Sequence, residues 1–222
     1  MKGFILGKKN KQSQTFNEKM ERIPITYIKT SPCYLVDIKC LNNNKLFSLK
    51  FGFDEAKKIK KPIQGQLLKA GIKTPLRFFR EFRIPDNILI EKIKEGEKIG
   101  IKIGEKTLFI GQEIKPTLFF KKGDRVSISG ISKGKGFQGV VKRHGFAGGP
   151  KTHGQSDRER APGSIGQTTT PGRIYKGKRM AGRMGNQRVT IKNLPVIDVK
   201  EEELIVKGLI PGGKGGLLEI VG

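Results

Sequence analysis

Apolar residues alternate with polar ones along much of the chain, a pattern typical of half-buried antiparallel strands. These runs cover residues 23–27, 34–40, 47–53, 99–103, 126–128, 189–191, 196–199 and 204–206. The charged cluster Lys200–Glu203 separates the last two runs and is typical of a hairpin connection. Because many short strands with few helices favour a barrel or a sandwich over a parallel α/β sheet, we predict a mainly β fold.

Residues 54–120 interrupt this pattern. The apolar spacing after Pro62 suits a short helix that ends at Gly71. A basic and aromatic stretch, residues 76–83, follows the helix before the strand alternation resumes. We therefore predict a small mixed α/β insertion at 54–120, between strand-rich regions at 1–53 and 121–222.

The segment Ile131–Thr190 differs from the rest of the chain. It holds thirteen basic residues against two acidic ones, a net charge of +11, together with thirteen of the thirty glycines. Only fourteen of its side chains are apolar or aromatic, and they follow no period. Burial of so few apolar groups recovers less free energy than ordering sixty backbones costs. We therefore predict an arm that is mobile when free and is ordered by RNA or DNA.

The whole chain is also strongly basic. Its 45 lysines and arginines outnumber 20 acidic residues, which gives a net charge of +25. Such a charge calls for a polyanionic partner, and nucleic acid is the leading candidate. Lysine interrupts every apolar run well before the ~18 residues of a membrane span, so we expect no membrane partner and no targeting segment. Cys33 and Cys40 are expected to be free thiols, partly buried.

Three sequence features that could carry other chemistry are better explained without it. Gly134–Gly139 fits a dinucleotide-binding spacing, but glycine and proline follow where a helix should run, so a glycine-rich loop that contacts RNA is favoured. His144 and His153 have no neighbouring cysteine and form no structural zinc set; they either bind phosphate or a base, or are exposed loop residues. Ser156 near His153 lacks the rigid surroundings of a hydrolytic triad. We expect no enzyme activity, metal, cofactor or small-molecule substrate.

A cluster of phenylalanines, Phe78, Phe79 and Phe82, is interleaved with arginines in the basic stretch. Exposed rings of this kind can stack on nucleic-acid bases. We expect at least two of the rings to pack in the core instead, with the arginines lining an edge that faces RNA.

Four sequence blocks are distinctive in their order and spacing: Ser132–Arg143, Thr152–Gly154, Arg160–Gly166 and Lys176–Asn186. Together they resemble the universal large-subunit ribosomal protein L-three family, bacterial type. Weaker likeness extends over essentially the whole chain.

The resemblance implies a translation-protein-type β-barrel built from 1–53 and 121–222, with the insertion at 54–120 and an extended internal finger at 131–190. It also implies a structural constituent of the large ribosomal subunit that binds rRNA near its 3′ end, promotes early assembly and buttresses the peptidyl transferase centre through the finger. Neighbouring large-subunit proteins would be its other partners. The location would be the cytoplasmic ribosome, or an organellar ribosome if the source genome is plastid-like.

The polar and basic residues of the finger are the candidate rRNA-binding residues. They are Lys133, Lys135, Lys142, Arg143, His144, Lys151, His153, Arg158, Arg160, Gly163, Ser164, Gln167, Arg173, Lys176, Lys178, Arg179, Arg183 and Arg188. The alternative function is a non-specific nucleic-acid-binding protein or RNA chaperone, which the charge alone permits. An RNA-modifying enzyme is disfavoured because no rigid set of catalytic groups is visible.

Overall fold

The computed structural model describes residues 3–41, 46–84, 90–95, 98–103 and 106–222. It divides into two compact units. The barrel unit comprises Met1–Ile131 and Arg188–Gly222, and the internal unit comprises Ser132–Gln187. The internal unit falls within the segment that the charge and glycine content set apart, and each unit is described by itself below.

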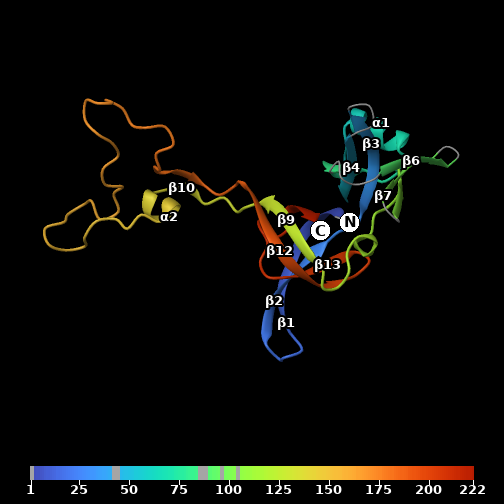
Figure 1. Cartoon of the computed structure of the whole chain (residues 1–222), viewed down its shortest axis with the longest axis horizontal. Coiled ribbons are helices and arrows are strands. Elements are labelled where there is room, and N and C mark those ends of the chain that lie inside the picture. Colours follow the sequence, from blue (N-terminus) through green and yellow to red (C-terminus); the bar gives the residue numbers. More distant parts are fainter. Residues whose placement is uncertain (1–2, 42–45, 85–89, 96–97, 104–105) are drawn as a thin grey trace. The chain divides into compact units, whose positions relative to one another are not determined.

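Six strands of the barrel unit close into an antiparallel barrel (Figure 1). They are β1 (Phe4–Phe16), β2 (Arg22–Lys29), β9 (Arg125–Ile131), β12 (Arg188–Val199), β13 (Glu203–Lys207) and β14 (Leu217–Val221). The order around the ring is β1-β14-β9-β12-β13-β2, and β2 pairs with β1 to complete it. Closure leaves no free strand edge in the ring. The prediction of a mainly β fold is therefore confirmed.

Two further sheets belong to the barrel unit. The first contains β3 (Cys33–Leu41), β4 (Leu46–Glu55) and β5 (Leu76–Ile84), in that order. The second contains β6 (Ile90–Glu95), β7 (Lys98–Ile103) and β8 (Lys106–Phe109), and a 3-10 turn follows at Pro116–Leu118. The expectation that all strands of 1–53 join the barrel is wrong for β3 and β4. Instead, β3 pairs with β4, and β4 pairs along its length with β5, from Phe47↔Ile84 to Glu55↔Leu76.

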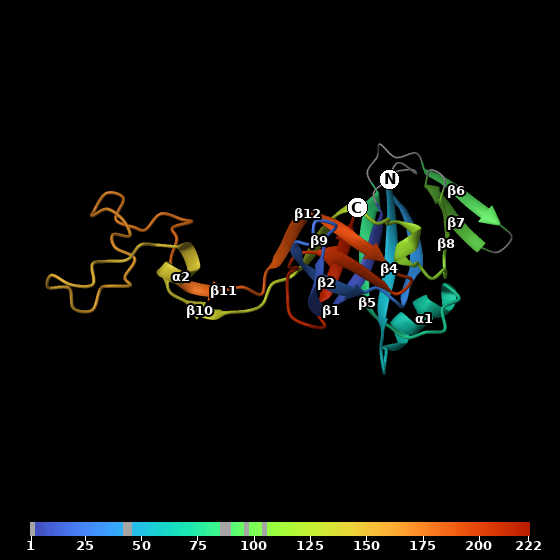
Figure 2. The ribbon, with the colours of Figure 1, turned by 90° about the horizontal axis from the view of Figure 1, so that it is seen from below.

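The helix α1 (Lys61–Lys69) lies where the apolar spacing predicted it. Pro62 stands at its first turn, where the missing N–H has no helical partner to lose. Leu67 and Ala70 pack against Val36 and Leu76 of the β3-β4-β5 sheet, beside which Figure 2 shows the helix. The insertion thus combines a helix with strands, as the sequence indicates.

One hydrophobic core joins the barrel to the β3-β4-β5 sheet. Fully buried side chains from the barrel strands, such as Ile5 and Ile128, share it with Phe51 of β4. The ring of Phe82 stacks on Phe4, with centroids 4.6 Å apart. Phe78 packs on the same core and Phe79 on the α1 cluster, which confirms the expected packing of these rings. Cys33 is buried, Cys40 is half-buried, and both are free thiols.

The internal unit contains little regular structure. A short two-stranded ribbon forms from β10 (Gly136–Gln138) and β11 (Gly182–Met184), and a five-residue helix, α2 (Val140–His144), follows β10 (Figure 1). The structure describes every residue of this unit, and Val140 is the only buried one. A unit with one buried side chain has almost no hydrophobic core to stabilise it. In the described part of the whole chain, no helix is long and apolar enough to span a membrane.

Candidate nucleic-acid interface

The two chain ends of the internal unit are held together by hydrogen bonds. The Ser132 N–H donates to the Gln187 carbonyl at 2.9 Å, and the Gln187 N–H donates to Ser132 Oγ at 3.3 Å. The Lys135 N–H donates to the Met184 carbonyl at 2.9 Å, next to the paired residues of β10 and β11. These contacts bring Lys135, which precedes β10, and Arg183 of β11 to the same short ribbon.

The close approach of these segments requires a glycine at position 185. Gly185 has a φ of +77°, a conformation that side chains rarely adopt. A Cβ atom there would lie 2.1 Å from the Lys133 carbonyl oxygen, which is backbone and has little freedom to move. The glycine therefore permits the ribbon and its neighbouring loop to pack.

The helix α2 is tied to the residues before β11 through one carbonyl group. Arg143 Nη1 donates to the Met180 carbonyl at 2.6 Å, and His144 Nε2 lies 2.9 Å from the same oxygen. Because a carbonyl oxygen only accepts, the His144 Nε2 atom carries the hydrogen in this contact. The Arg143 guanidinium also lies against Gly182, where a Cβ would come within 2.7 Å of Nη1. This packing places the Arg143 and His144 side chains beside the ribbon.

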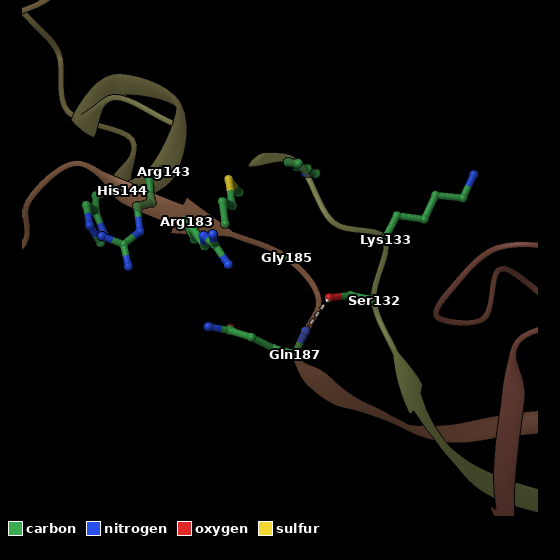
Figure 3. Close-up of a pocket in the computed structure, with 9 residues that line it drawn as sticks. Ser132, Lys133, Arg143, His144, Arg183, Gly185 and Gln187 are labelled. Carbon is green, nitrogen blue, oxygen red and sulfur yellow. Dashed lines mark hydrogen bonds between the residues drawn. The ribbon is translucent and has the colours of Figure 1, made fainter. Parts of the chain in front are cut away.

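A cavity of about 420 Å³ opens where the ribbon meets α2 (Figure 3). Arg143, His144 and Arg183 gather at one part of it, while the labelled Lys133 side chain points away (Figure 3). No acidic residue lines this cavity in the described structure, so its charge is positive. An anionic group such as a phosphate is therefore the complementary ligand. The lining residues are Ser132, Lys133, Lys135, Arg143, His144, Arg183, Met184, Gly185 and Gln187.

Two more concavities lie in the irregular part of the internal unit. One, of about 470 Å³, is lined by residues 163–168 and 172–174, which include Gly163, Ser164, Gln167 and Arg173. The other, of about 420 Å³, contains Arg158 and shares Gly163 with the first. The structure thus brings a second group of predicted site residues together, separately from those at the ribbon.

The remaining predicted residues of the internal unit are exposed and lie outside these concavities. They are Lys142, Lys151, His153, Arg160, Lys176, Lys178 and Arg179. All ion pairs found between described residues lie in the barrel unit, so none of them neutralises a cation of 132–187. In the described chain, no group of three or more His, Cys, Asp or Glu side chains is placed to hold a metal ion.

Arg188 is the one predicted site residue outside the internal unit. It begins β12 of the barrel and forms an ion pair with Glu219 of β14. Arg80 of β5 donates to the same carboxylate at 3.0 Å. Arg188 therefore has an intramolecular anion as its partner, unlike the cations of the internal unit.

Four residues that line the cavity were missed by reasoning from the sequence, and Phe137 was included only as part of the loop Gly134–Gly139 expected to contact RNA. Ser132, Met184, Gly185 and Gln187 line the cavity, but nothing in the spacing of the cationic residues marks them. Phe137 of β10 is 72% exposed. A signal for Phe137 exists in the sequence, since it is a large apolar residue between glycines and lysines where no core is predicted.

Comparison with known proteins gives consistent results along the chain. Residues 88–208 match the family described as Ribosomal protein L3. A protein of Thermosipho africanus named "Large ribosomal subunit protein uL3" is 43% identical over 219 residues, which cover 98% of this chain and 96% of that protein. A protein of the same name from Chloroflexus aggregans is 47% identical over 220 residues, covering 97% and 95% of the two chains.

Proposed function

Because the chain belongs to the ribosomal protein L3 family, we propose that it is a structural constituent of the large ribosomal subunit and binds large-subunit rRNA. The observation that carries this proposal is similarity over nearly the full length of relatives named for that subunit. The protein has a structural role in the ribosome and is not an enzyme. Other large-subunit proteins are its neighbours there.

The internal unit is the proposed rRNA contact. It has twelve basic residues against two acidic ones, and its single buried side chain provides almost no core. Cations without intramolecular carboxylate partners gain free energy when they neutralise phosphates and release counterions. Contact with rRNA would therefore supply the ordering free energy that this unit lacks.

The predicted site residues of the finger take two roles in this proposal. The lysines and arginines of 132–187 bind phosphates, whereas His144, His153, Ser164 and Gln167 donate or accept hydrogen bonds at phosphates, sugars or base edges. Gly163 leaves room for the backbone to approach the RNA. The resemblance further suggests that the finger extends through the rRNA and buttresses the peptidyl transferase centre.

The finer assignment concerns place and time. Binding near the 3′ end of the large-subunit rRNA, early in subunit assembly, follows from the family resemblance. The similar proteins from Thermosipho africanus and Chloroflexus aggregans favour a bacterial cytoplasmic ribosome over an organellar one.

Co-sedimentation tests the proposed function. We expect the full-length protein to remain with large ribosomal subunits after a high-salt wash, because many phosphate contacts would have to break at the same time for it to leave the folded subunit. Release of the protein into the supernatant at the salt concentration that removes loosely bound proteins would contradict the proposal.

Competition separates this function from its alternative, a non-specific nucleic-acid-binding protein or RNA chaperone. A transcribed 3′ fragment of large-subunit rRNA should displace the protein from bulk RNA at a lower concentration than bulk RNA itself does. Equal competition by both RNAs would favour the chaperone.

A further inference from the structure

The ribbon of the internal unit presents an aromatic ring and a guanidinium group together. Phe137 of β10 pairs directly with Arg183 of β11. Directly opposed residues of an antiparallel pair project from the same face, with Cβ atoms about 5 Å apart. Both residues are exposed, and the ring of Phe137 is 72% accessible. The ribbon therefore carries a solvent-exposed ring and a solvent-exposed cation side by side.

The surroundings of Phe137 leave its ring uncovered. Cβ atoms placed at Gly136 or Gly139 would meet nothing within 4 Å beyond their own chain neighbours, so no other segment packs against these flanking positions. The core that could bury a phenylalanine is absent, since Val140 is the only buried side chain of this unit. An exposed ring loses the free energy that its burial would give, which indicates a contact partner outside the chain.

The charge next to the ring indicates the chemistry of that partner. Arg183 also lines the cationic cavity, together with Lys135 and Arg143. A planar apolar group next to an anion matches this combination, and an unpaired nucleotide has both. Its base offers a face for stacking, while the bases of a duplex are already stacked on each other. A protein partner would match the ring but would not account for the arginine paired with it on the ribbon.

We propose that Phe137 and Arg183 form a binding site for one unpaired nucleotide of rRNA, whose base stacks on the ring and whose phosphate pairs with the guanidinium group. This inference rests on the proposed function and deepens it, because it assigns recognition of a single-stranded nucleotide to the ribbon.

Affinity measurements on full-length variants test the aromatic contact. The probe is a transcribed 3′ fragment of large-subunit rRNA. Phe137→Ala should lower affinity about 5- to 150-fold, the range found for loss of one stacked base. Phe137→Tyr keeps a ring and should bind within about 2-fold of the wild type. Phe16→Ala is the matched control, because Phe16 is also an exposed phenylalanine, 59% accessible, but lies in β1 of the barrel unit.

Salt dependence tests the phosphate contact. Arg183→Gln should reduce the slope of log affinity against log salt by about 0.7, the value for one single-strand phosphate. Phe137→Ala should leave this slope unchanged, because stacking releases no counterion. A direct readout is ultraviolet crosslinking of the complex, which should attach a nucleotide to the tryptic peptide 136–142, where Phe137 is the only aromatic residue.

Several results would overturn the site. One is that Phe137→Ala binds the rRNA fragment with the same affinity as the wild type. Another is that nucleotides crosslink to other parts of 132–187 but not to peptide 136–142. Normal rRNA binding by Phe137→Ala combined with failed incorporation into subunits would assign the ring to a protein neighbour instead. The proposed function fails differently, since wild-type protein would then show no preference for the rRNA fragment over bulk RNA.

Discussion

Charge reversal at Arg179 and Arg183 should weaken incorporation into large subunits without destabilising the barrel. Both side chains are exposed in the internal unit, and neither takes part in an ion pair between described residues. In the free protein their positive charges are therefore surrounded by solvent, and in the complex they are available for phosphates.

The magnitude follows from counterion release. Loss of two phosphate contacts should make the slope of log affinity against log salt shallower by about 1.4 for single-stranded RNA or about 1.8 for a duplex. Between about 50 and 200 mM salt, the affinity of Arg179→Glu/Arg183→Glu should then fall about 7- to 12-fold less than that of the wild type. At low salt, the reversed variant should bind the rRNA fragment more weakly than the wild type.

The assay is a titration of rRNA fragment at several salt concentrations, paired with urea unfolding of the free protein. Arg179→Lys/Arg183→Lys keeps both charges and should retain the wild-type slope. The free energy of unfolding of the barrel should change by less than about 0.5 kcal/mol, as is usual for surface substitutions. An unchanged slope in the reversed variant, or a large loss of barrel stability, would refute the reasoning.

Three further predictions concern single positions. Gly185→Ala should destabilise the folded arrangement of 132–187 by about 1 kcal/mol or more, because position 185 has a positive φ and an added Cβ would clash with backbone. The variant should therefore be cleaved faster by trypsin within 132–187 in the rRNA complex. Gly139→Ala, at a position with open space and a φ of −69°, should leave the cleavage rate unchanged. Ile128→Ala should lower the free energy of unfolding by about 2 to 5 kcal/mol in urea, because this barrel side chain is fully buried, whereas Ile131→Ala at a 52% exposed position should have little effect. Burial raises the pKa of the Cys33 thiol from 9.0 to about 12. Above pH 9 this thiol therefore ionises in the unfolded chain before it does in the folded one, and the free energy of unfolding should fall as the pH rises towards 12. Cys33→Ala should lose less stability over that pH range, and equal losses in both proteins would exclude the thiol as a cause.

Strand positions were predictable from the sequence, but strand partners were not. The alternation at 34–40 and 47–53 marks β3 and β4 correctly, yet it does not say that β4 pairs with β5 outside the barrel. Periodicity reports which face of a strand is buried and carries no information about its neighbour. Partners are decided by tertiary packing.

Irregular backbone also concealed two elements. The runs at 189–191 and 196–199 belong to one strand, β12, whose alternation is broken by a register shift between Ile191 and Leu194. Asn193 has a φ of +65° in this bulge, so it resets which face each side chain occupies. The helix α2 escaped prediction because it is only five residues long and lies between glycines.

The composition of the candidate site was predictable, while its grouping was not. Charge and glycine content marked the cations of 131–190, which the structure distributes among a ribbon cavity, two distal concavities and exposed loops. Arg188 has the same charge as the others but lies in the barrel unit and pairs with Glu219. Charge along a chain does not reveal which cations already have an intramolecular partner.

Amide hydrogen exchange of the full-length protein, with and without the rRNA fragment, tests the central claim most directly. Barrel amides should be protected in both samples, because they belong to a closed sheet with its own core. Amides of 132–187 should exchange rapidly without RNA and become protected when it is bound. Equal protection of 132–187 in both samples would show that this unit orders itself, which would contradict the account.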